Sequence, residues 1–102
     1  MRYTLVIVLK YSHSHDRTKT ANPEEYFDAE NLDTAVVIAK AMLQSIKIKY
    51  EKKSNNVEEL SGFLWLGTQR VVWKSNLVSQ VTQTKKEIVT PEHFNEEFIP
   101  SS

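Results

Sequence analysis

The chain has 102 residues, of which 40% are hydrophobic and 25% charged, a composition typical of a single globular domain. Thirteen Lys and Arg residues balance thirteen Asp and Glu residues, so the formal net charge of zero gives no global attraction to nucleic acid or to a membrane. The sequence contains no cysteine, which excludes disulfides and thiolate chemistry and favours an intracellular, cytoplasmic setting.

The first segment, residues 2–11, has the alternation of a β-strand. Its odd-numbered positions from Tyr3 to Tyr11 are all apolar, and Val6 and Val8 make the opposite face apolar as well. The run is too short for a signal-peptide core or a membrane span, so we expect a soluble chain with no membrane partner. A polar loop, residues 12–23, and a short acidic strand, residues 24–29, follow.

A long helix is the clearest element that the sequence predicts. Asn31 is a suitable N-cap, and no Gly or Pro interrupts the segment before the stop signal at residues 54–56. Apolar residues recur at intervals of three and four and define the face that we expect to be buried: Leu32, Ala35, Ala39, Met42, Leu43, Ile46 and Tyr50.

The second half of the chain predicts further strands. Residues 60–66 and 69–74 form a hairpin around Gly67 and Thr68, and residues 77–83 and 87–89 supply two shorter strands.

The end of the chain has the signature of a helix start. Thr90 is a suitable cap, and Pro91 fits the first helical position. We therefore expect a short C-terminal helix with Phe94 and Phe98 facing the body.

The order of these elements predicts an α+β fold in one domain, residues 1–102. We expect a small, mostly antiparallel sheet of four to five strands, one long helix on one face and a short C-terminal helix.

A histidine pair in the first loop is the one candidate metal site. If the strand extends this far, His13 and His15 point to the same side and Asp16 could add an oxygen ligand. The alternative is an exposed polar loop, which we favour because two imidazoles do not make a tight site. We therefore assign no metal or other cofactor.

Catalytic motifs do not stand out in the sequence. There is no Gly-rich phosphate loop and no Gly-x-Ser-x-Gly setting, and the adjacent carboxylates are of the kind that most often lie on solvated surface. The sequence thus favours a binding role over an enzymatic one, and we nominate no catalytic residue.

Aromatic and basic residues gather in the predicted hairpin: Phe63, Trp65, Arg70, Trp73 and Lys74. Aromatic side chains beside bases are used to grip single-stranded nucleic acid. Trp and Arg also dominate protein–protein interfaces, and ordinary core packing is a third possibility for the Trp residues. The face that each Trp occupies depends on a strand register that the sequence does not fix.

The apolar character of both faces of two strands carries the functional expectation. One long helix covers one face of the sheet, and large apolar patches are uncommon on monomers. We expect an interaction module that contacts another protein or forms a homodimer through the sheet or its edge. At least one of Trp65 and Trp73 should then be buried against a partner. The alternative is a nucleic-acid-binding protein that uses the same aromatic and basic face.

Overall fold

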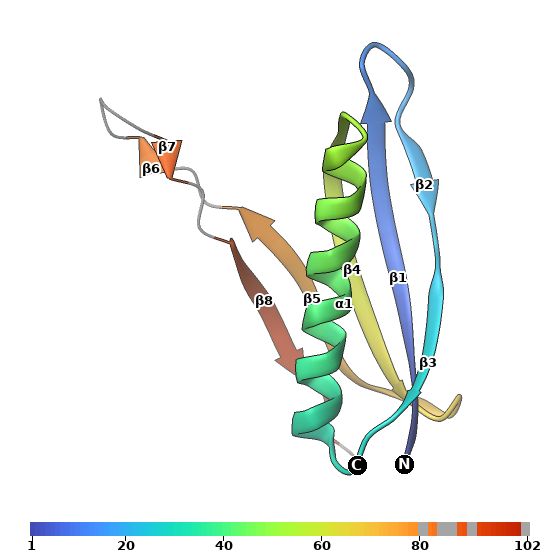
Figure 1. Cartoon of the computed structure of the whole chain (residues 1–102). Helices are drawn as coiled ribbons and strands as arrows, with labels where there is room; N and C mark the ends of the chain where they lie inside the picture. The colour runs from blue at the N-terminus through green and yellow to red at the C-terminus, as the bar shows by residue number, and fades with distance from the viewer. Residues whose placement is uncertain (80–81, 84–87, 90–91, 101–102) are drawn as a thin grey trace.

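The computed structural model describes residues 1–79, 82–83, 88–89 and 92–100. One helix lies on one face of a six-stranded antiparallel sheet, which confirms the α+β class (Figure 1). The elements are β1 (Arg2–His13), β2 (Lys19–Ala21), β3 (Glu24–Asp28), α1 (Leu32–Lys52), β4 (Asn55–Leu66), β5 (Arg70–Ser79), β6 (Thr82–Gln83), β7 (Ile88–Val89) and β8 (Glu92–Phe98). The main sheet has the order β2-β1-β4-β5-β8, with β3 also paired to β1, and β6 and β7 form a separate ribbon.

Strand β1 lies inside the sheet, which accounts for apolar residues on both of its faces. It pairs with β4 along one edge, and with β2 and β3 along the other. Tyr3, Leu5, Ile7 and Leu9 point toward the helix and are at most 1% exposed. The even-numbered side chains point to the opposite face of the sheet.

Helix α1 begins and ends close to where the sequence predicts. The Asn31 side chain accepts a hydrogen bond from the Thr34 backbone N–H at 2.9 Å, as an N-cap does. The helix ends at Lys52, and Ser54 then adopts a positive φ of 64° before β4 begins. The predicted apolar face is confirmed, because all seven of its residues belong to the core or pack against it.

Gly62 of β4 allows the helix to approach the sheet closely. A Cβ atom at this position would lie 2.9 Å from Leu43 Cδ1 and 3.3 Å from Leu5 Cδ1. Carbon atoms pack at about 3.5–4.0 Å, so a larger residue at this position requires the Leu43 side chain or the helix to move.

A β-bulge in β5 decides which residues reach the core. Trp65 is opposite Val71, but the next residue back along β4, Leu64, is opposite Trp73. Val72 is the extra residue of the bulge, and it reverses the alternation of β5 beyond it. Trp73 therefore points toward α1 and is fully buried.

The predicted C-terminal helix is wrong. Residues Glu92–Phe98 form β8, which pairs with β5 along seven residues. The spacing of Phe94 and Phe98 fits a helix face, but it also fits one side of a strand, where positions i and i+4 again point the same way. The edge of β5 offers backbone groups to pair with, and this favours the strand.

Other differences concern the extent of strands. The loop over residues 12–23 contains the short strand β2, and β4 begins five residues before the expected position 60. Strand β5 runs without a break through Ser75 and Asn76. The helix start expected at Thr90 and Pro91 lies outside the described residues.

Candidate functional site

The face of the sheet turned away from α1 is here called the open face. In the part of the chain that the structure describes, no element covers it (Figure 1). At its centre is an apolar strip of partly exposed side chains from β1 and β4: Val6, Val8, Phe63 and Trp65. Val6 is directly opposite Phe63, so the strip is continuous across the two strands.

Polar contacts hold the end of the strip near Trp65. Thr4 lies opposite Trp65, is only 4% exposed, and donates its hydroxyl proton to the Gly67 carbonyl at 2.9 Å. A small hollow of about 210 Å³ lies beside the Trp65 side chain and is also lined by Val6 and Glu24. The apolar strip therefore ends at a hollow and not at a flat surface.

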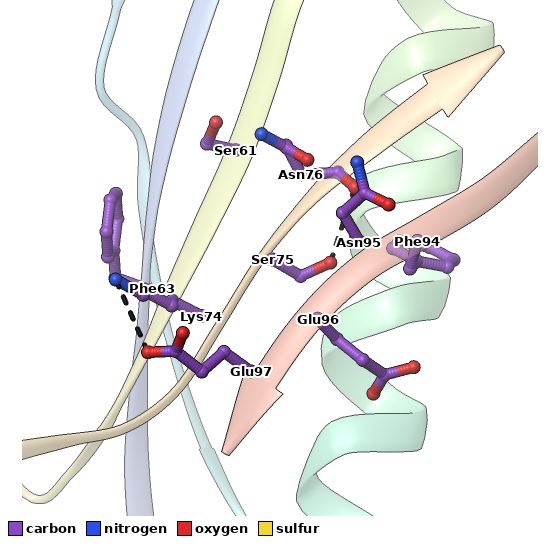
Figure 2. A pocket seen from close by; sticks show the side chains of 9 residues that line it. All are labelled: Ser61, Phe63, Lys74, Ser75, Asn76, Phe94, Asn95, Glu96 and Glu97. Carbon is purple, nitrogen blue, oxygen red and sulfur yellow. Dashed lines mark hydrogen bonds and ion pairs between the residues drawn. The ribbon is translucent and has the colours of Figure 1, made fainter. Parts of the chain in front are cut away.

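A second, wider hollow opens over β4, β5 and β8, with a volume of about 620 Å³ (Figure 2). Phe63, Lys74 and Glu97 lie on the open-face side of the strands, whereas Phe94 and Glu96 lie toward the helix. Such a wide, shallow hollow suits the side chains of a large partner better than a small ligand, because small-molecule sites enclose most of their ligand.

Three cross-strand ion pairs flank the apolar strip. Arg2 Nε lies 3.0 Å from Asp28 Oδ1, Lys10 Nζ lies 3.6 Å from Glu59 Oε2, and Lys74 Nζ lies 3.5 Å from Glu97 Oε2. All six side chains are well exposed, so each pair contributes little to stability. The ion pairs affect recognition more than they affect stability, because each base on the described open face already has an acidic neighbour.

Two of the edge strands, β3 and β8, are acidic, whereas the edge strand β2 carries Lys19. Strand β3 carries Glu24, Glu25 and Asp28, and β8 carries Glu92, Glu96 and Glu97, while neither strand contains Lys or Arg. Charged edge strands resist pairing with another strand. Edge-to-edge pairing of two copies would also bring like charges together.

The structure separates the five hairpin residues that the sequence singled out. Phe63, Trp65 and Lys74 lie on the open face. Arg70 is exposed, but it pairs with Leu66 on the helix side. Trp73 is in the core of its own chain, so of the two Trp residues only Trp65 is available to a partner.

Trp73 is part of a polar contact between the helix and the edge of the sheet. Its Nε1–H donates to Glu96 Oε1 at 3.1 Å, and Lys40 Nζ donates to Glu96 Oε2 at 2.7 Å. The hydrogen bond from Lys40 holds the pKa of Glu96 below its ordinary value, and the bond from Trp73 acts in the same direction against partial desolvation. This lowered pKa has a structural cause in the contact between α1, β5 and β8.

The histidine pair lies at the far end of β1. His13 is the last residue of β1, and the Asp16 N–H donates to the His13 carbonyl in the turn that includes His15. All three side chains are exposed. Among the described residues no group of three or more His, Cys, Asp or Glu side chains is placed to hold a metal ion.

The described surface thus offers an apolar strip between neutralised charges.

None of the helices in the described ranges has the length and apolarity needed to cross a membrane. No protein-family model, no curated protein and no solved structure matches the chain.

Proposed function

We propose that this chain is a protein-interaction module whose open face binds another protein. The observation that supports the proposal is the apolar strip of Val6, Val8, Phe63 and Trp65, which is uncovered at the centre of the sheet. Burying such a strip gains about 25 cal/mol for each Å² of apolar surface removed from water. Trp65 is its largest side chain and the type of residue most enriched in binding hot spots.

The charges indicate the chemistry of the partner. The bases that the structure describes on the open face lie in ion pairs, and the edge strands β3 and β8 are acidic. A partner with an apolar surface flanked by Lys or Arg complements this arrangement, and charge complementarity of this kind steers association.

Nucleic acid fits the same surface less well. Binding of nucleic acid depends on Lys and Arg side chains that neutralise phosphates. Lys74, the base beside Phe63 on the neighbouring strand, lies 3.5 Å from Glu97. A phosphate would have to displace this carboxylate and approach an acidic edge.

The experiment compares three immobilised proteins: the wild type, Trp65→Lys, and Asn56→Lys as a control. Asn56 is exposed near the start of β4 and pairs with Ser12, so the control adds the same charge at the opposite end of the strand from Trp65. Cell extract is passed over each protein, retained proteins are identified by mass spectrometry, and binding is then measured with the purified partner. Circular dichroism checks that the variants are folded.

The expected result is a partner that binds the wild type and Asn56→Lys and that Trp65→Lys loses, in the extract and with purified components alike. Equal binding by all three proteins would contradict the proposal. So would a wild type that copurifies with nucleic acid, shown by a high 260/280 nm absorbance ratio, and releases it with salt.

A further inference from the structure

The outer side of α1 has an unusual composition for a surface helix. Its exposed residues over the middle four turns are all uncharged, and they are here called the outer stripe: Thr34, Val37, Ala41, Gln44, Ser45 and Ile48. Val37 is 67% exposed and Ile48 is 50% exposed, so two β-branched apolar side chains face water. The solvent side of an amphipathic helix normally carries charged residues.

The charged residues of this part of the helix are directed elsewhere. Lys40 is half-buried and bonds Glu96 of β8. Lys47 bonds Glu51 one turn further on, and its side chain is only 12% exposed. The outer stripe is therefore a continuous uncharged surface, and the partly buried Ile38 and Met42 extend it toward β3 through a hollow of about 490 Å³.

The two ends of α1 carry opposite charges. Glu30 and Asp33 are exposed at the N-terminal end, and Lys49, Lys52 and Lys53 are exposed at the C-terminal end. These charges complement the helix dipole, which accounts for the ends but not for the uncharged middle.

We propose that α1 pairs with α1 of a second copy of this chain, antiparallel, through the outer stripe. Reversing the helix about the point between residues 42 and 43 places Val37 level with Ile48 of the second copy, and Ala41 within one residue of Ser45 of the second copy. The small side chains then lie at the centre, where they let the helices approach closely, and the larger apolar ones lie on either side. Such an interface is isologous, because each contact occurs twice about the two-fold axis.

Charge complementarity selects a second copy and the antiparallel direction. In this arrangement Asp33 comes near Lys52 of the second copy, and the acidic end of each helix meets the basic end of the other. A parallel pair would place acid on acid and base on base.

The proposed dimer uses a different surface from the proposed partner site on the open face, so both interactions can form at the same time. The helix and the open face lie on opposite sides of the sheet (Figure 1). Pairing through α1 gives four layers, sheet, helix, helix and sheet, and leaves both open faces on the outside.

The test uses Ala41→Glu and Ala41→Lys, because position 41 is exposed and both residues are good helix formers. The dimer brings the two copies of position 41 close to the axis, where like charges repel. Sedimentation and light scattering from micromolar to millimolar concentration should show a wild-type dimer. Each single variant should weaken the dimer by about 100-fold or more. A 1:1 mixture of the two variants should restore the dimer, in a form weakened by salt.

The mixture also excludes misfolding as the cause, because an unfolded variant would not be rescued by its opposite. Trp65→Lys should remain dimeric, so this experiment and that on the open face can fail separately. A monomeric wild type at every concentration would overturn the inference. A dimer that survives Ala41→Glu, or one that Trp65→Lys abolishes while both Ala41 variants keep it, would overturn it as well.

Discussion

Glu96 joins three elements through one carboxylate. It lies on β8, accepts hydrogen bonds from Lys40 of α1 and Trp73 of β5, and its side chain is 30% exposed. Lys40 Nζ also lies 5.4 Å from the centre of the Phe94 ring, which adds a cation–π contact. The contact ties the edge strand to the helix.

This contact predicts a dependence of stability on pH. Because the pKa of Glu96 is lower in the folded chain, the unfolded chain binds the proton more tightly, so ionised Glu96 stabilises the fold above the ordinary glutamate pKa of about 4.3. That stabilisation is lost as the pH falls through the lowered pKa. The difference in unfolding free energy between wild type and Glu96→Gln, measured by urea denaturation, should shrink over this range.

The two Trp residues should respond differently to the same substitution. Trp73→Lys places an ammonium group in a fully buried position and should unfold the chain, because an unpaired buried charge costs several kcal/mol out of a total stability of about 5–15 kcal/mol. Trp65→Lys should leave the far-UV circular dichroism and the melting temperature nearly unchanged. If both variants unfold, Trp65 is a core residue and the proposed open-face site loses its main support.

At the scale of elements, the contact between α1 and β4 depends on Gly62. Gly62→Ala should destabilise the fold by about 1–3 kcal/mol, because the added methyl group overlaps Leu43 Cδ1. Ser61→Ala, on the opposite face of the same strand, should cost much less. Urea denaturation measures both.

A double mutant separates overpacking from a local effect on the strand. Leu43→Ala leaves space above Gly62, so combining it with Gly62→Ala should cost less than the sum of the two single changes. Additive losses would show that the glycine does not set the distance between helix and sheet.

At the scale of the whole molecule, we expect the acidic residues of the edge strands to keep copies of this chain from pairing edge to edge. Replacing Glu24, Glu25 and Asp28 of β3 with Thr should increase aggregation at high concentration, because the edge then presents an uncharged, β-favouring strand. Light scattering over time measures the effect. As a control, Asp16, Glu51 and Glu58 are replaced instead. This control has the same net charge as the β3 variant, but its edge strand is unchanged. Equal aggregation of the two variants would therefore assign the effect to net charge alone.

Much of the fold follows from local patterns. The Asn31 cap, the three-and-four spacing of apolar residues and the absence of Gly and Pro define α1 without reference to any other element. The two apolar faces of β1 likewise indicate an interior strand, as the structure shows. The absence of charge on the outer stripe of α1 can also be read from the sequence, once the buried face gives the orientation of the helix.

Only the tertiary structure decided that the last segment is a strand, and which side chains lie on the open face. Residues Glu92–Phe98 form a strand because β5 offers an edge to pair with, and the spacing of Phe94 and Phe98 fits a helix equally well. In a regular hairpin Trp73 would lie opposite Phe63 on the open face, but the bulge at Val72 turns it into the core. The shift of a single residue reverses the face of every later side chain, and that shift depends on packing between strands and not on the local sequence.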